Sequence, residues 1–239
     1  MKKLLSLLFL LLFCLGCDEV QNKSKKINAI SFHYDKIDII GFQVFIRKDM
    51  QGYSQIKEAI QLLTHDLIEL KHLVSPTHFT FFQKVNIWVE WNSNSPKAVH
   101  YIPSSLAWIK RNNYLPEKQQ GIEILNIKNY IQFSCLQPYM LLHEFAHAYH
   151  HQVIGYENCL ILDTYWNVIE KKLYDSVAYI KPFKKWKKTR AYAAHDAKEY
   201  FAELTESYFG LNDYFPFNKT DLQTFDPQGF QMMEKFWGK

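Results

Sequence analysis

The sequence predicts an α+β fold, with a small mixed sheet packed against helices and a mostly helical C-terminal half. Short apolar runs of strand length are confined to the first 126 residues, whereas two of three segments with helical apolar spacing follow residue 137. The composition, 48% hydrophobic and 16% aromatic, is that of a globular chain able to bury a large core. We therefore expect a single domain over residues 29–239.

The first half is predicted to alternate strands with one long helix. Residues 36–47 (KIDIIGFQVFIR) are apolar and β-branched, which predicts a strand. Residues 54–74 carry apolar side chains at helical spacing, which predicts an amphipathic helix stopped by Pro76. Three further strands are predicted at 85–91 (VNIWVEW), 98–103 (AVHYIP) and 121–126 (GIEILN), with a short helix or turn at 104–112.

The next predicted helix, residues 138–155, is unusually apolar. Pro138 suits a first helical position, and Gly155 suits the stop after the last turn. Its polar side chains are His143, Glu144, His147, His150 and His151. Unpartnered polar groups on a buried helix are costly, so these side chains require partners.

The spacing of two of these histidines indicates a metal site. His143 and His147 are four residues apart, so both rings leave the same helix face and can converge on one tetrahedral cation. Glu144 is placed to take a proton from a metal-bound water. The alternative is a pair of core or helix-end histidines. His150 and His151 lie near the helix end, where a cation meets the negative pole of the helix dipole, and this is their predicted role.

A catalytic zinc needs three protein ligands and one open position. A third histidine six residues after the second is excluded because Val153 stands there, which leaves a carboxylate from another helix. Asp196 is predicted to cap a helix with Glu199, Glu203 and Glu206 along one stripe. Its core stripe is Ala197, Phe201, Leu204 and Tyr208. Spacing alone does not choose among the three glutamates, because Glu199 also fits a capping box and the other two fit a solvated face.

These motifs resemble the gluzincin metallopeptidases, specifically the Mlc titration factor A family and the catalytic domain of anthrax lethal factor. The resemblance rests on HEFAH at 143–147, a tyrosine at 192 seven residues before Glu199, and EYFAE at 199–203. It is specific over 137–217 and looser from about Ala98 to Trp237. It implies a zincin-like fold, one Zn²⁺ per chain and hydrolysis of a peptide or protein substrate.

The resemblance also implies a role for each site residue. The zinc ligands would be His143, His147 and Glu199. Glu203 would accept a hydrogen bond from the second ring nitrogen of a ligand histidine. Tyr192 would donate to the oxyanion, and Glu144 would act as general base and then as general acid. In such peptidases the strand before the zinc helix is the sheet edge, so residues 121–126 are expected to pair with the substrate.

A second class of function stays open at this point. A catalytically inactive zincin-fold protein of the cell envelope could bind peptides or glycans through its aromatic residues. The complete set of Glu144, Tyr192 and Glu199 favours the enzyme, because a binding protein has no need of the general base.

The N-terminus predicts export. Residues 1–16 resemble a bacterial lipoprotein signal peptide, with two lysines before an apolar run too short to span a bilayer. Leu15, Gly16 and Cys17 resemble the end of a lipobox, so Cys17 is the expected lipidated residue and 17–28 a polar tether. The protein is therefore expected at the bacterial cell envelope, anchored to the membrane. Cys14 stands where leucine is usual, which leaves ordinary cleavage and secretion as the alternative.

The remaining features are less specific. A net charge of +4 gives no argument for nucleic-acid binding. The basic run Lys181–Arg190 is predicted to be a solvated loop, with contact to an anionic surface or substrate as the alternative. Cys135 and Cys159 either pair in an oxidising compartment or pack as small buried side chains. Residues 156–181 are expected to form a helix and linker, and 212–218 (NDYFPFN) the floor of the cleft.

Overall fold

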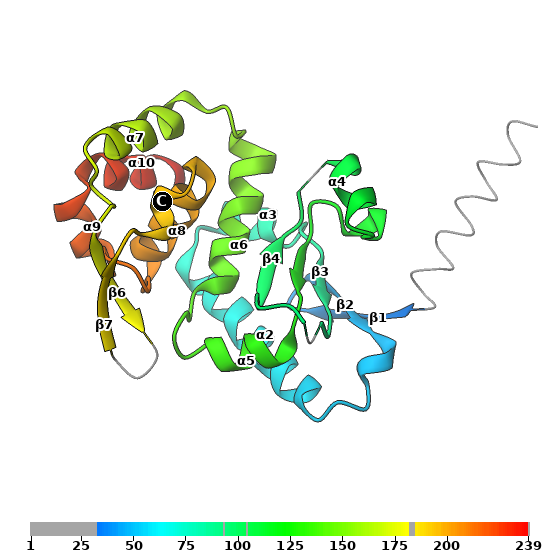
Figure 1. Cartoon of the computed structure of the whole chain (residues 1–239). Coiled ribbons are helices and arrows are strands. Elements are labelled where there is room, and N and C mark those ends of the chain that lie inside the picture. Colours follow the sequence, from blue (N-terminus) through cyan, green and yellow to red (C-terminus); the bar gives the residue numbers. More distant parts are fainter. Residues whose placement is uncertain (1–32, 93, 104, 182–184, 239) are drawn as a thin grey trace, which may run out of the picture.

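The predicted α+β class is confirmed by the computed structural model, which describes residues 33–92, 94–103, 105–181 and 185–238. Figure 1 shows a sheet on one side, the C-terminal helices on the other, and helix α6 between them. The predicted signal peptide (1–16), Cys17 and the tether (17–28) lie outside the described residues. Within the described part of the chain, no helix combines the length and apolar character needed to cross a membrane.

The main sheet has five strands in the order β1-β2-β3-β5-β4. Its central pairs, β2 with β3 and β3 with β5, are parallel, and the two outer pairs are antiparallel. The strands are β1 (Tyr34–Ile39), β2 (Phe42–Arg47), β3 (Ile87–Val89), β4 (Val99–Tyr101) and β5 (Ile122–Ile124). The sheet is therefore mixed, as the sequence predicts.

The predicted single strand at 36–47 is wrong, because the chain reverses in its middle. Ile40 and Gly41 both adopt positive φ, 46° and 93°, and the register pairs Ile39 with Phe42. Two successive residues with positive φ form the tight turn that suits a two-residue hairpin. Isoleucine rarely adopts positive φ because this conformation is costly for a β-branched residue. Gly41 was therefore the one sequence signal for a turn at this point.

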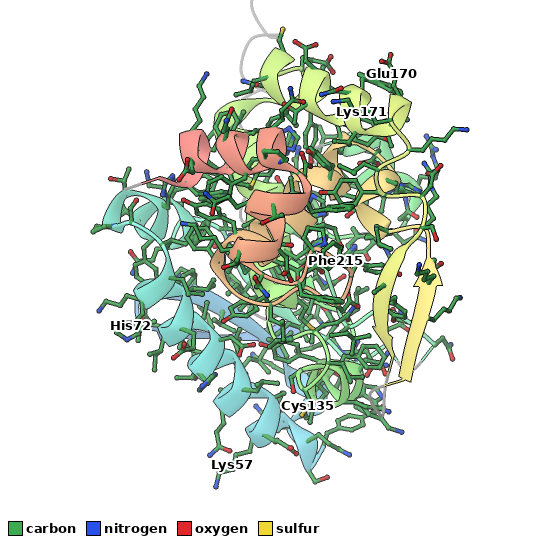
Figure 2. All side chains as sticks on the ribbon, turned by 90° about the vertical axis from the view of Figure 1, so that its left-hand side faces the viewer. Lys57, His72, Cys135, Glu170, Lys171 and Phe215 are labelled. Carbon is green, nitrogen blue, oxygen red and sulfur yellow. The ribbon has the colours of Figure 1, made fainter. Side chains whose placement is uncertain are left out.

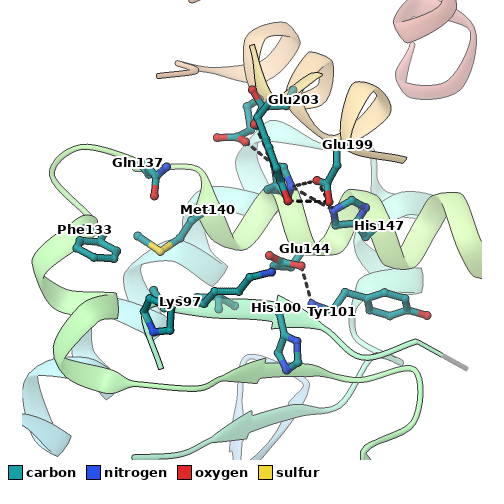
Figure 3. A pocket seen from close by; sticks show the side chains of 16 residues that line it. Lys97, His100, Tyr101, Phe133, Gln137, Met140, Glu144, His147, Glu199 and Glu203 are labelled. Carbon is teal, nitrogen blue, oxygen red and sulfur yellow. Dashed lines mark hydrogen bonds and ion pairs between the residues drawn. The ribbon is translucent and has the colours of Figure 1, made fainter. Parts of the chain in front are cut away.

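The predicted edge strand is also wrong. Residues 121–126 contain β5, which lies between β3 and β4, and the edge is β4. All three residues of β5 are buried, including Glu123. An uninterrupted buried run is typical of an interior strand. The antiparallel partner β4 covers its outer side, and β4 is the strand that runs beside α6 (Figure 3).

The long amphipathic helix is confirmed as α2 (Gln55–Leu73). Its buried residues are Ala59, Leu63, Leu67 and Leu70. Figure 2 shows Lys57 and His72 projecting outward from the opposite face. Pro76 does more than stop α2, because it is the first residue of α3 (Pro76–Phe82), whose Ser75 cap accepts from the His78 amide.

The histidine-rich helix is α6 (Met140–Tyr149), continued by a π-helical turn, His150–Ile154, up to Gly155 at φ 88°. It begins two residues later than Pro138 predicts. The predicted core residues Leu141, Phe145 and Ala148 are at most 1% exposed. Because α6 packs between β4 and α8, both of its sides are covered, which explains its high apolar content.

Helices and one hairpin make up the C-terminal half. The elements are α7 (Cys159–Glu170), β6 (Val177–Lys181), β7 (Lys185–Thr189), α8 (Ala197–Phe209), α9 (Lys219–Phe225) and α10 (Pro227–Trp237). The remaining helices of the first half are α4 (Leu106–Arg111) and α5 (Ile127–Phe133). One continuous hydrophobic core includes residues of both halves.

Three smaller predictions need correction. Residues 185–189 of the basic run, which was expected to be a loop, form β7 and pair with β6. Residues 212–218 extend the same hairpin, because the amide of Ile180 donates to the Asp213 carbonyl and the amide of Phe215 donates to the Ala178 carbonyl, with Phe215 packed against the core. Cys135 and Cys159 are both free and exposed, so neither of their predicted alternatives holds.

Candidate metal centre

Two packed helices bring the predicted ligands together. His143 and His147 project from α6, and Glu199 projects from the first turn of α8. Asp196 caps α8 by accepting from the amides of Lys198 at 2.8 Å and Glu199 at 3.0 Å, as predicted. Glu199 does not complete a capping box, because its carboxylate reaches the two histidines instead.

The three donor atoms form an equilateral triangle. Nε2 of His143, Nε2 of His147 and Oε2 of Glu199 are each 3.1 Å from the other two. Tetrahedral zinc with ligands at about 2.0–2.2 Å has its donor atoms roughly 3.3–3.6 Å apart. Two imidazoles and one carboxylate are also a ligand set that zinc accepts. The residues present therefore fit such a cation with little rearrangement.

His143 and Glu199 shift each other's pKa values. Burial lowers the pKa of His143, but hydrogen bonds to Glu199 and Glu206 outweigh burial and raise it well above its usual value. Burial likewise opposes ionisation of Glu199, yet the bonds to His143 and His147 bring its pKa below the usual range. A proton and a metal ion therefore compete for the same nitrogen atoms.

The carboxylate that orients His143 is Glu206 rather than the predicted Glu203. Oε1 of Glu206 lies 2.6 Å from Nδ1 of His143, whereas the nearest Glu203 oxygen is 3.9 Å away, too far for a hydrogen bond. Glu206 follows Glu199 by seven residues, which is close to two full helical turns. Around the helix axis, the Glu206 side chain therefore points closer to the direction of Glu199 than the Glu203 side chain does. Glu203 instead accepts from Asn212 Nδ2 at 3.1 Å. Both glutamates are buried, so the solvated-face alternative is wrong.

Glu144 faces β4 across a cleft of about 390 Å³ that also contains the donor triangle. Its Oε2 accepts from the backbone amide of Tyr101 at 2.6 Å, and Figure 3 shows this bond between α6 and the edge strand. The bond fixes the orientation of the carboxylate. The second oxygen can then accept a proton within the same cleft.

The edge strand β4 presents backbone groups to this cleft. The Ala98 carbonyl accepts from the Leu125 amide at 2.9 Å, and the Ile102 amide donates to the Gly121 carbonyl at 2.9 Å. The backbone groups of Ala98 and Ile102 therefore point toward β5. Because backbone direction alternates along a strand, Val99 and Tyr101 direct their amide and carbonyl groups outward. β4 thus has the position that the sequence assigned to residues 121–126.

Tyr192 lies at the other side of the cleft, in a short 3₁₀ turn (Tyr192–Ala194) before α8. Its hydroxyl donates to Oε1 of Glu199 at 3.0 Å, and its side chain lines the cleft. Burial and the charge of Glu199 raise the pKa of Tyr192. The hydroxyl therefore stays protonated and available as a donor at neutral pH.

The two histidines beyond the donor pair are not helix-end cations. His150 is fully buried beside Phe201 and Tyr156, and burial lowers its pKa to about 3. Nδ1 of His151 lies 2.8 Å from the Tyr101 hydroxyl, and its ring stacks on Tyr156. Burial lowers the pKa of His151 as well. The π-helical turn rotates both rings into packed surroundings, which the predicted α-helix did not anticipate.

No protein-family model, no curated protein and no solved structure matches this chain. What the site can do chemically follows from its own donor atoms, its cleft and the strand beside it. Sequence reasoning missed the contributions of Glu206 and of the Tyr101 backbone to the site. Only Glu206 carried a signal, as the third member of the glutamate stripe.

Proposed function

We propose that this protein is a zinc-dependent peptidase of the gluzincin type with a zincin-like fold. The observation that carries the proposal is the triangle of His143, His147 and Glu199 donor atoms, mutually 3.1 Å apart, in one cleft with Glu144. A buried pair of histidines with a purely structural role has no need of a third donor at equal distances or of an open cleft.

The chemistry divides between the cation and the chain. His143, His147 and Glu199 would hold the zinc ion, which when bound would supply a Lewis acid for a carbonyl group and would lower the pKa of a water molecule. Glu144 takes the proton of the attacking water and then returns it to the leaving amine. Its bond to the Tyr101 amide keeps the carboxylate directed into the cleft during both transfers. Glu206 holds His143 in the tautomer that presents Nε2 to the cleft.

Tyr192 contributes to the stabilisation of the oxyanion. Its hydroxyl is bonded to Glu199 in this structure, so it must exchange that bond for one to the substrate oxygen. Because its pKa is raised, the hydroxyl makes this exchange as a donor. A donor used only when charge develops accelerates the chemical step more than it strengthens substrate binding.

The substrate class follows from β4. An extended peptide can add to the outward-facing amide and carbonyl of Val99 and to the carbonyl of Tyr101, while the Tyr101 amide stays bonded to Glu144. Backbone pairing of this kind gives affinity independent of side chains. The resulting strand would pass directly over the cleft that holds Glu144. With the predicted signal peptide and lipidated Cys17, the substrates would be peptides or proteins of the cell envelope.

The test is one isosteric substitution with a matched control. Glu144→Gln should retain one zinc per chain but lose all cleavage of a peptide library, because an amide cannot take the proton of water. Glu157→Gln, an exposed position outside the cleft, should keep both properties. Cleavage by the Glu144→Gln protein at the wild-type rate would refute the mechanism. A zinc-loaded wild type that binds peptides without cleaving any would favour the binding-protein alternative.

A further inference from the structure

The cleft has two chemically different ends. His147, Tyr192 and Glu199 line one end, beside the donor triangle. The other end is lined by Pro96, Lys97, Phe133, Gln137 and Met140. Figure 3 shows Phe133 and Met140 on the side of the cleft away from Glu199 and His147, with the Lys97 side chain extending from below them toward Glu144. Nothing in the proposed hydrolysis uses this second end.

Lys97 lies just before the edge strand β4, which begins at Val99. It is exposed and belongs to an irregular segment of the chain. Its side chain lines the cleft, and within the described residues it makes no ion pair.

The charge along the cleft is uneven. Four glutamates line it, at positions 144, 199, 203 and 206, and among the described lining residues Lys97 is the one lysine or arginine. A ligand carboxylate is therefore repelled along the glutamate side and attracted to Lys97. Phe133 and Met140 are half-buried and supply apolar surface next to it. The combination suits a group with an apolar body and a carboxylate.

We propose that this end, formed by Pro96, Lys97, Phe133 and Met140, is a substrate subsite that recognises a carboxylate. The carboxylate is either the C-terminus of the peptide or an acidic side chain near the bond that is cut. The apolar part of the substrate packs on Phe133 and Met140, and Lys97 pairs with the charge. This subsite rests on the proposed peptidase function and specifies its substrate class.

Binding to the zinc-loaded Glu144→Gln chain separates recognition from cleavage. The probes are fluorescein-labelled peptides of three to eight residues, made of alanine with one leucine, each with a terminal carboxylate or carboxamide. A second set ends in carboxamide and carries one glutamate or glutamine at each position in turn. The first set tests a C-terminal carboxylate and the second an acidic side chain. Fluorescence anisotropy gives Kd for each pair.

The expected result is a roughly threefold to tenfold tighter Kd for the carboxylate member of at least one pair, as for a partly exposed ion pair. The preference should shrink at 1 M salt and vanish in Lys97→Gln. Lys128→Gln removes an equal charge from exposed surface outside the cleft and should leave it intact. Unchanged melting of Lys97→Gln would show that the loss is local.

Two results would overturn the subsite: equal Kd values within every pair, or a carboxylate preference that survives Lys97→Gln. Failure of the peptidase proposal looks different. In that case the Glu144→Gln chain shows the Lys97-dependent preference, while zinc-loaded wild type cleaves none of the peptides that bind. Recognition of the carboxylate would then stand without the hydrolysis.

Discussion

Two clusters of buried carboxylates in the described part of the chain are balanced in opposite ways. The first, here called the sheet cluster, joins Glu90 and Glu123 to Lys118, with Arg47 pairing to Glu90 at 2.9 Å. Two carboxylates thus face two permanent cations. Burial lowers the pKa of Lys118, but the two glutamates outweigh it and raise that pKa above its usual value. The chain itself completes this cluster.

The second, here called the metal-site cluster, joins Glu199, Glu203 and Glu206 to His143 and His147. Within the described residues, no lysine or arginine pairs with these three carboxylates. Burial and the charge of Glu206 raise the pKa of Glu203 well above its usual value.

The difference supports the proposal of a cation at the metal-site cluster. A buried charge without a partner is expensive, so a fold keeps such groups only where something offsets them. In the sheet cluster a lysine and an arginine do so. In the metal-site cluster the available partners are histidines, which are neutral ligands when they bind a metal. A divalent cation between them would supply the missing positive charge.

Removing both histidine donors should abolish metal retention. In His143→Ala with His147→Ala, one carboxylate remains of the three donors, so stoichiometric zinc should be lost after dialysis. His65→Ala with His72→Ala, two exposed histidines of α2, is the control and should keep its zinc. Elemental analysis of folded protein measures both. Full zinc occupancy in the first double variant would show that His143 and His147 do not hold the zinc.

Breaking the sheet cluster should cost stability and leave the metal in place. Lys118→Met removes the cation that both buried carboxylates share and leaves Glu90 with Arg47 and Glu123 with His100, so the expected loss in the free energy of unfolding is about 3 kcal/mol. Adding Glu90→Gln and Glu123→Gln should recover part of it, because no buried carboxylate then lacks its lysine partner. Urea unfolding measures the loss, and zinc content per folded chain should not change. A neutral effect of Lys118→Met would show that the cluster is not held by its ion pairs.

The two inner glutamates of α8 should differ in their effect on zinc. Glu206→Leu removes the acceptor from His143 Nδ1 and should weaken zinc binding by about 10–100-fold. Glu203→Leu removes only the bond from Asn212 and should weaken it less. Competition with a coloured chelator gives both affinities, and melting curves show whether each variant folds. The reverse order would restore Glu203 as the residue that orients the ligand.

The smallest expected effect concerns Asp213, a buried carboxyl bonded to Gln137 at 2.8 Å. Burial and the charge of Glu206 raise the pKa of Asp213 from 3.8 to about 6. Its protonated form therefore favours the folded state below pH 4, and this contribution is lost as the pH rises through 6. In Asp213→Asn the loss should be absent, since Asn still accepts from Gln137.

Urea midpoints in chelator, from pH 4 to pH 7.5, test this prediction without interference from metal release. The free energy of unfolding of wild type should fall relative to Asp213→Asn across that interval. Parallel curves for the two proteins would mean that Asp213 titrates normally and that the acidic side of the cleft is better solvated than its burial suggests.

The sequence by itself determined the features that depend on neighbours along the chain. The spacing of His143 and His147 placed both rings on one helix face, and Asp196 marked the start of α8 because its side chain bonds to amides two and three residues later. The apolar pattern of 54–74 defined α2 almost to the residue. The zincin resemblance and the predicted signal peptide stay predictions.

Only the tertiary structure decided which elements meet. Glu203 and Glu206 share one helix stripe, and the packing of α8 on α6 chose Glu206 for His143. Strand order made β4 the edge, and two residues with positive φ split the first strand into a hairpin. The π-helical turn buried His150. Each of these outcomes depends on contacts between segments far apart in the chain, whereas periodicity and capping report only on contacts within a few residues.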